Sequence, residues 1–267
     1  MGIKFNITPS DKLDLTLAYF RQSEPEGSNF SGDVTFGNSG AGRYSYDITT
    51  NTYASLAGND VNIRELNQFN ARAAYVLDDD WEIGASAQLG GIYNSELKEA
   101  EISTAFAGHL EGNFGNFNLK TEFINYNYRA KDNAGEDLEL IQLGAYGFNY
   151  PVASEANLYV LGLAYNIPVD IGPISSIQPY VDYTLIDKLN EGFYNTHHLV
   201  PGMLITAGKI YMYVDYAIGK NHPWLTDDFG KGIGQGVKDA QWLSRFNINI
   251  GYYLYFVSAI IFAKQIL

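Results

Sequence analysis

Cysteine is absent from the sequence, and basic residues are scarce relative to acidic ones. Without cysteine, neither disulfides nor thiolate-bound metals stabilise the fold, although this absence names no cellular compartment. The 17 lysines and arginines face 30 aspartates and glutamates, which gives a formal net charge of -13. Because nucleic-acid binding needs clustered positive charge to neutralise phosphates, the sequence excludes a nucleic-acid partner.

Long apolar runs are also missing. The longest uncharged apolar stretch, YYLYFVSAIIFA near the C-terminus, falls short of the roughly 20 residues that a membrane helix needs. The N-terminal stretch MGIKFNITPSDK lacks the basic region and apolar run of a secretory signal, so an exported form would be a mature or truncated chain. No linker divides the sequence, and we expect one domain over residues 1–267.

Tyrosine, phenylalanine and glycine are abundant instead, with 21, 15 and 27 copies, a composition typical of all-β proteins. In residues 244–256, SRFNINIGYYLYF, mostly apolar side chains alternate with polar ones. A period of two predicts a β-strand whose two faces meet different surroundings. The same alternation around PSDK (9–12) and DDD (78–80) predicts hairpins, and the whole chain predicts roughly eleven strands, or about twelve if the number is even. One strand shifts phase near Phe123 and Ile124, as at a β-bulge.

The distribution of charge decides between two interpretations of these strands. In a soluble sheet the apolar side faces a core, whereas in a membrane barrel it faces lipid and the polar side faces a wet lumen. The apolar sides of the better-phased strands carry no charged residue, which suits lipid, since a charge there costs about 2 to 4 kcal/mol. We therefore predict an antiparallel up-and-down transmembrane β-barrel, with a soluble barrel or sandwich as the alternative. The predicted pore-lining residues on the polar sides are Asp14, Arg72, Glu82, Glu111, Lys120, Glu122, Asp182, Asp215 and Arg245.

The connections between strands are sorted by length. Short turns, such as 9–12 and 78–80, alternate with long connections over residues 23–63 and 222–241. Bacterial outer-membrane barrels show this sorting, with short periplasmic turns and long outer loops. We expect the apolar sides to face lipid, at residues that include Leu15, Met212, Val214, Ile248 and Ile250.

Three stretches resemble Gram-negative outer-membrane porins: YVLGLAYNIPVDIGPISSIQPYVDYTLIDK, ITAGKIYMYVDYAIGKNHPWL and RFNINIGYYLYF. The resemblance is nearest to the broad class that includes the phosphate-selective O/P porins. It implies a location in the bacterial outer membrane, contact with lipid and lipopolysaccharide, a homotrimer, and passive diffusion of small hydrophilic solutes. Such porins have about sixteen strands, so the shorter pattern here indicates a truncated porin or a smaller channel of about twelve strands.

The predicted function is a channel without covalent chemistry, cofactor or metal. The acidic excess among the predicted pore-lining residues favours mild cation preference, although the resemblance to phosphate porins implies anion preference. The alternatives are a substrate-specific channel of about twelve strands, a phospholipase-like barrel hydrolase, and a structural barrel with a closed lumen. A hydrolase would need a Ser-His pair, but His109 falls on the inward side with no serine at a matching position, which favours pore lining.

The segment Leu140–Ala156 allows two interpretations. As a pair of wall strands it restores an even strand number, whereas as a loop folded into the lumen it narrows the pore. We expect a strand over Leu140–Tyr146 and a candidate constriction over Gly147–Ala156. The candidate constriction residues are Phe148, Tyr150 and Glu155.

Two patterns near the C-terminus point to a solvated loop instead of a ligand site. Asp227, Asp228 and Asp239 lack the alternating spacing of a calcium loop. The sequence GKGIGQG at 230–236 lacks the Lys-Ser/Thr pair and the following helix of a phosphate loop.

The last predicted strand has to close the barrel by pairing with another strand. We expect residues 244–256 to pair with Gly2–Thr8 and close the barrel. The tail Ser258–Leu267 contains Ile260 and Ile261, which are costly to leave in water, and we expect it to extend the wall or add a strand.

Overall fold

The computed structural model describes residues 2–21, 63–145, 148–225 and 232–253. Within these ranges no helix is long and apolar enough to cross a membrane. The strands are β1 Gly2–Ser10, β2 Leu13–Arg21, β3 Ile63–Val76, β4 Trp81–Asn94, β5 Glu99–Phe114, β6 Phe117–Asn127, β7 Leu140–Ala145, β8 Phe148–Ala153, β9 Glu155–Tyr165, β10 Ile167–Ile171, β11 Ile174–Lys188, β12 Thr196–Ala207, β13 Ile210–Lys220 and β14 Leu243–Tyr252.

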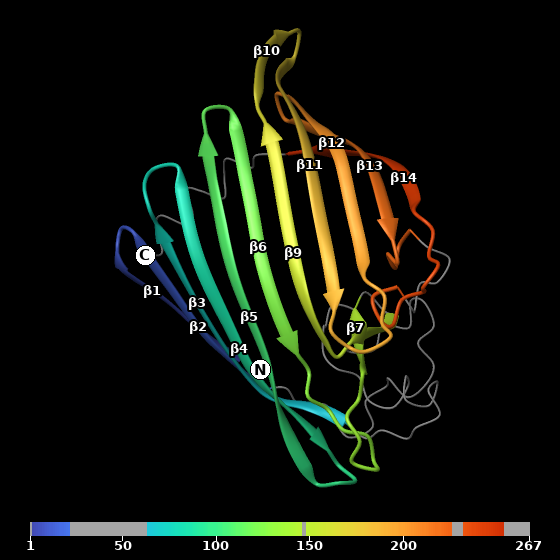
Figure 1. Cartoon of the computed structure of the whole chain (residues 1–267). Helices are drawn as coiled ribbons and strands as arrows, with labels where there is room; N and C mark the ends of the chain where they lie inside the picture. The colour runs from blue at the N-terminus through green and yellow to red at the C-terminus, as the bar shows by residue number, and fades with distance from the viewer. Residues whose placement is uncertain (1, 22–62, 146–147, 226–231, 254–267) are drawn as a thin grey trace.

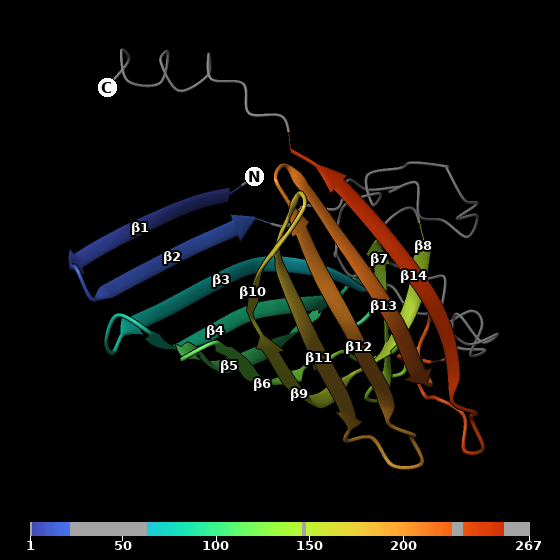
Figure 2. The same cartoon turned by 90° about the horizontal axis from the view of Figure 1, so that it is seen from above.

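Most of these strands form one antiparallel sheet, in the order β1-β2-β3-β4-β5-β6-β9-β11-β12-β13-β14. The short β10 continues the line of β9 and pairs with the same neighbour, β11, so the sheet has 12 strands. Figures 1 and 2 show that the sheet curves into a trough with a convex outer face and a concave inner face. The prediction of an all-β, antiparallel, up-and-down wall of about 12 strands is confirmed.

The connections at one end of the sheet are all short turns, whereas the long connections lie at the other end together with the four-residue turn 95–98 (Figure 1). We call these the turn end and the loop end. Three two-residue turns at the turn end begin with Gly115, Gly172 and Gly208, whose φ angles are 59°, 58° and 60°. A side chain would strain this left-handed conformation, which explains glycine at each position. The loop end carries the connections 128–154 and 221–242, so the predicted sorting by length is confirmed.

The described strands do not close into a complete barrel, because β1 and β14 are not paired with each other. An even number of antiparallel steps separates the two strands, so both run from the loop end to the turn end. Antiparallel partners must run in opposite directions, and the predicted pairing of residues 244–256 with Gly2–Thr8 is therefore wrong. Residues 254–267, with the predicted additional strand, and most of the predicted loop 23–63 lie outside the described residues.

Strand β6 keeps an unbroken register with both of its neighbours, so the predicted bulge near Phe123 is wrong. Ile124 and Tyr126 consequently lie on the same face of the sheet as Glu122. The hydroxyl of Tyr126 donates to the backbone oxygen of Ala153 at 3.0 Å. Ala153 belongs to the hairpin of β7 and β8, which lies over the concave face in Figure 2. The hairpin therefore covers the ring of Tyr126, which explains a large side chain on the polar side of β6 without a bulge.

Strands β7 and β8 form a separate two-stranded sheet, which we call the inner hairpin. An apolar cluster joins it to the loop end of the wall, where Ile141 of β7 is 0% exposed and Ile92 of β4 is 2% exposed. The interpretation of Leu140–Ala156 as two wall strands is wrong, because β7 and β8 fold over the concave face and only Glu155 and Ala156 belong to the wall, in β9. The buried members of the cluster are Ile63, Ile92, Ala130, Ile141 and Val152.

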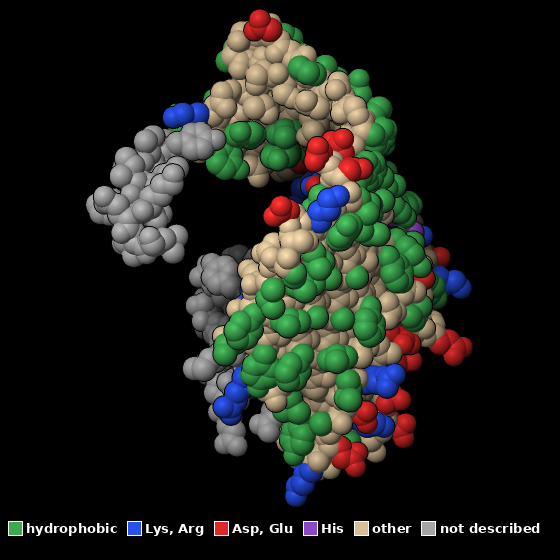
Figure 3. Space-filling view, turned by 90° about the vertical axis from the view of Figure 1, so that its left-hand side faces the viewer, with side chains coloured by type: hydrophobic (Ala, Val, Ile, Leu, Met, Phe, Trp, Pro, Cys, Tyr) green, Lys and Arg blue, Asp and Glu red, His purple; other side chains and the backbone are tan. Residues whose placement is uncertain are grey.

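The convex face is apolar, and apolar side chains cover a broad area of the surface in Figure 3. The register places the residues predicted to face lipid on this side, and Ile248 and Ile250 are 54% and 64% exposed. Aromatic rings gather near both ends of the strands, which suits the headgroup levels of a bilayer. At the turn end the contacting rings are Trp81, Phe114, Phe117 and Tyr165, and at the loop end they include Tyr183, His197 and Trp242.

Candidate functional site

The polar face of the sheet is its concave face. Tyr126 shares a face with Lys120 and Glu122 and touches the inner hairpin, which lies inside the trough. Following the cross-strand pairs from β2 to β14 places all nine predicted pore-lining residues on this face.

These nine residues occupy four successive cross-strand rows. Rows are two residues apart along a strand, or about 7 Å, so the charged band covers about 20 Å of strand length. From the loop end to the turn end, the rows hold first Arg72; then Asp14 and Glu122; then Glu82, Glu111, Lys120, Asp182 and Arg245; and last Asp215.

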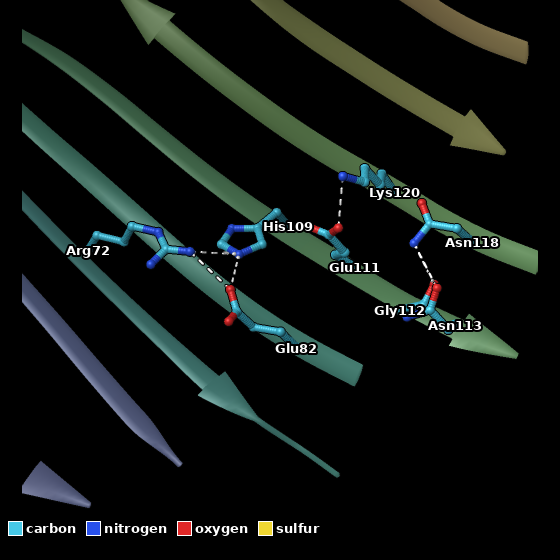
Figure 4. A network of polar contacts seen from close by, with 8 residues as sticks. All are labelled: Arg72, Glu82, His109, Glu111, Gly112, Asn113, Asn118 and Lys120. Carbon is cyan, nitrogen blue, oxygen red and sulfur yellow. Dashed lines mark hydrogen bonds and ion pairs between the residues drawn. The ribbon is translucent and has the colours of Figure 1, made fainter. Parts of the chain in front are cut away.

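Over β3 to β6, four of the five charged residues of the band form ion pairs, and Glu122 forms none with a described residue (Figure 4). Arg72 forms an ion pair with Glu82 at 3.0 Å, and Lys120 forms one with Glu111 at 2.8 Å. His109 Nε2 lies 3.2 Å from the same Glu82 carboxylate and 3.3 Å from the Arg72 guanidinium. These groups are largely open to solvent, so each pair contributes at most about 1 kcal/mol to stability, and their main effect is to balance charge.

His109 therefore belongs to a charge network. Its polar contacts in the described part of the chain are with an arginine and a glutamate, which is not the Ser-His arrangement of a hydrolase. Gly84 on β4 makes room for the imidazole, since a Cβ there would lie 2.2 Å from His109 Cε1.

The wall from β11 to β14 holds a different arrangement. The Tyr180 hydroxyl donates to one oxygen of Asp215, and the Asn247 amide donates to the other at 3.1 Å. Tyr213 lies beside Tyr180, with ring centroids 6.4 Å apart. The ring of Tyr180 lies over Gly202, where a Cβ would come within 2.5 Å of Tyr180 Cζ.

The candidate constriction residues divide between two elements. Phe148 and Tyr150 belong to β8 of the inner hairpin, and their side chains lie outside the described part of the structure. Glu155 is the first residue of wall strand β9, where it accepts a hydrogen bond from the Asn127 amide at 3.0 Å. Glu155 thus lies at the loop-end rim, and a role for the three residues in constriction stays a prediction.

Sequence reasoning missed a set of buried polar residues that fixes the connection between β13 and β14 to the rim. Lys188 is 6% exposed, and its ammonium donates to the backbone oxygen of Gly232 at 2.6 Å. The hydroxyl of Thr196 donates to the same oxygen at 2.8 Å. Asn221, 2% exposed, exchanges hydrogen bonds with the backbone of Val237. The backbone N–H of Ala153 donates to Ile233 O at 3.3 Å, which continues this contact to the inner hairpin.

The glycines of GKGIGQG are the feature of the sequence that could have indicated this close contact between the β13–β14 connection and the rim. Gly236 has a φ of 74°, and a Cβ there would lie 2.5 Å from Tyr194 O and 3.1 Å from Lys188 Nζ. The backbone of this segment approaches the rim closely, which only glycine permits. Asp227 and Asp228 lie outside the described residues, and the described part holds no group of three His, Cys, Asp or Glu side chains suited to a metal ion.

His222 is the second residue of the same connection and faces His198, with ring centroids 4.2 Å apart. Burial, and then repulsion from His198 and Arg245, lowers the pKa of His222 from 6.5 to about 4. The backbone N–H of Trp224 donates to His222 Nδ1 at 3.3 Å, which requires that nitrogen to be unprotonated.

We expect the contact of His222 with the wall to be fully formed above about pH 6.5 and to weaken as the pH falls towards 4, because the released segment binds the proton more readily. Trp224 fluorescence in a W81F/W242F background would report the change. His222→Phe should remove the dependence in this window. A signal that still changed with pH in that variant would contradict the assignment.

No family model matches the sequence, and no curated protein matches it. Solved structures do share its fold. The outer membrane channel DcaP of Acinetobacter baumannii aligns with a TM-score of 0.53 and 9% identity, over 93% of this chain and 60% of that chain. The anion-selective porin from Comamonas acidovorans aligns with a TM-score of 0.51 and 13% identity, over 93% of this chain and 58% of that chain.

The chain thus spans less than two thirds of the length of the two porins that it matches. LpxR from Salmonella typhimurium aligns with a TM-score of only 0.30, which does not establish a shared fold. The two porins confirm the predicted porin-type fold. The phosphate-selective O/P class and a longer parent barrel of about sixteen strands stay predictions.

Proposed function

We propose that the chain forms, as a single barrel domain over residues 1–267, the wall of a bacterial outer-membrane channel for small hydrophilic solutes or ions. The contrast between the two faces of the sheet carries this proposal: charged residues line the concave face, and exposed apolar side chains cover the convex face. A polar interior and a lipid-facing exterior are what a water-filled membrane barrel requires. Solutes pass by diffusion, without covalent chemistry or a cofactor.

The contrast between the polar concave face and the apolar convex face also indicates what each part of the barrel contacts. Lipid and lipopolysaccharide contact the convex face, where copies of the chain also meet in the predicted homotrimer. The loop end faces outwards and the turn end faces the periplasm, as in other outer-membrane barrels. The inner hairpin narrows the passage, because it is fixed to the wall at the loop end by the apolar cluster.

We expect the channel to prefer cations mildly, because six of the nine charged residues in the band are acidic. Reversal potentials across a planar bilayer under a salt gradient would measure this preference. The porin from Comamonas acidovorans is anion-selective, and a clear anion preference here would contradict our assignment. An inserted protein without any conductance would contradict the channel itself and favour a structural barrel.

A further inference from the structure

Four carboxylates of the charged band, Asp14, Glu122, Asp182 and Asp215, form no ion pair with any described residue, and the last two of them lie on β11 and β13. Over β3 to β6, Arg72 and Lys120 are each paired with a carboxylate. The acidic excess of the face therefore includes two neighbouring carboxylates on one side of the trough.

The contacts of Asp215 leave its charge uncompensated. Both of its donors, the hydroxyl of Tyr180 and the amide of Asn247, are neutral. Neutral donors orient the carboxylate but bring no positive charge to it. Asp215 thus has no cationic partner among the described residues.

Asp182 lies one cross-strand row closer to the loop end than Asp215, and its side chain reaches towards β9. A Cβ at Gly162 would lie 2.8 Å from Asp182 Oδ1, so this carboxylate lies across a position that has no side chain. Two cationic side chains share its row, but Lys120 is paired with Glu111, and the Arg245 guanidinium donates to Trp224 O at 3.0 Å. Neither cation neutralises Asp182 by direct contact.

Aromatic rings accompany the two carboxylates. Tyr213 is 42% exposed on the concave face, and Tyr180 packs against it edge to face. The face of an aromatic ring attracts a cation, and this attraction is strongest for weakly hydrated organic groups. Small inorganic ions such as K⁺ keep their water and gain less from a ring than guanidinium does.

We propose that Asp182 and Asp215, together with the rings of Tyr180 and Tyr213, form a subsite for organic cations, namely solutes that carry an ammonium or guanidinium group. The proposal rests on the channel function and names the solute class that the channel favours. The carboxylates supply the charge preference, and the exposed ring of Tyr213 adds preference for an organic over an inorganic cation.

The test uses the full-length protein in planar bilayers, with guanidinium on one side and K⁺ on the other. Wild type should favour guanidinium over K⁺, and the D182N/D215N variant should lose that preference. The matched control is D14N/E122Q, which removes the same charge from the concave face at carboxylates without an ion pair among the described residues. This control should keep the guanidinium preference while losing overall cation selectivity.

The ring has its own variant, Tyr213→Leu, which changes no charge. It should reduce the guanidinium preference about two- to fivefold, the effect of an exposed cation–π contact of about 0.5 to 1 kcal/mol. Equal effects of the two double variants would overturn the subsite and leave only a general effect of charge. An unchanged preference in both D182N/D215N and Tyr213→Leu would also overturn it, whereas a wild-type protein that did not conduct would overturn the channel.

Discussion

Replacing Ile248 by arginine is expected to abolish most of the insertion of the protein into lipid bilayers. Ile248 lies midway along β14 on the convex face and is 54% exposed. An arginine at mid-depth on the lipid face of a barrel costs about 2 to 4 kcal/mol, which lowers the inserted fraction about 30-fold to 900-fold. Refolding into vesicles, followed by heat-modifiable migration on a gel, would measure the inserted fraction.

The next residue in the chain supplies the control. Asn249 pairs with Tyr213 and points to the concave face, so Asn249→Arg adds the same charge on the side that faces water. This variant should insert nearly as well as the wild type. Equal losses in the two variants would show that lipid and water are not divided between the two faces of β14.

Replacing Ile141 by aspartate is expected to raise single-channel conductance clearly while the wall remains folded. Ile141 is 0% exposed in the apolar cluster that fixes the inner hairpin. An unpaired carboxylate in such a place costs several kcal/mol, so the hairpin should leave the wall. The wall strands pair with one another and not with the hairpin, which is why the barrel should survive. Conductance in planar bilayers would show the wider passage.

Thr16→Asp is the control for Ile141→Asp, because it adds the same negative charge to the concave face of the wall. Thr16 lies on the concave face of β2, and its hydroxyl donates to Asn6 Oδ1 at 3.1 Å. Its conductance should stay close to that of the wild type. A similar rise in both variants would attribute the change to charge, and an unchanged Ile141→Asp channel would show that the hairpin does not restrict flow.

The wall strands could be predicted from the sequence because the alternation of apolar and polar residues within each strand is a local feature. Alternation in stretches such as 244–256 follows directly from the opposite surroundings of successive side chains. The same rule assigned Asp14, Asp215 and the other seven charged residues to a common face before any pairing was known. The face on which a side chain lies follows from its position within its own strand, and it can be predicted without knowing which strands are neighbours.

The inner hairpin could not be predicted in this way. LIQLGAYGFNYPV has the length and apolar content of a wall strand pair, and only tertiary contacts, such as that between Ile141 and the cluster, place it inside the trough. The predicted bulge in β6 is wrong for a related reason. The pattern near Phe123 and Ile124 predicts a bulge, whereas β6 keeps its register and carries large side chains on its polar side, where Tyr126 donates to Ala153 O of the hairpin. Lys188 was missed because a buried lysine at a strand end has the same sequence pattern as a solvated one.

The shared direction of β1 and β14 limits how copies of the chain meet. Copies inserted in one orientation present, at either edge, a strand that runs from the loop end to the turn end. Any edge-to-edge contact between such copies is parallel, whereas every pair within the wall is antiparallel. A rotation about the membrane normal cannot reverse a strand, so identical copies cannot join their described edges β1 and β14 in the antiparallel pattern of the wall. An antiparallel seal between these two edges needs an odd number of further strands, the first and last of which run from the turn end to the loop end.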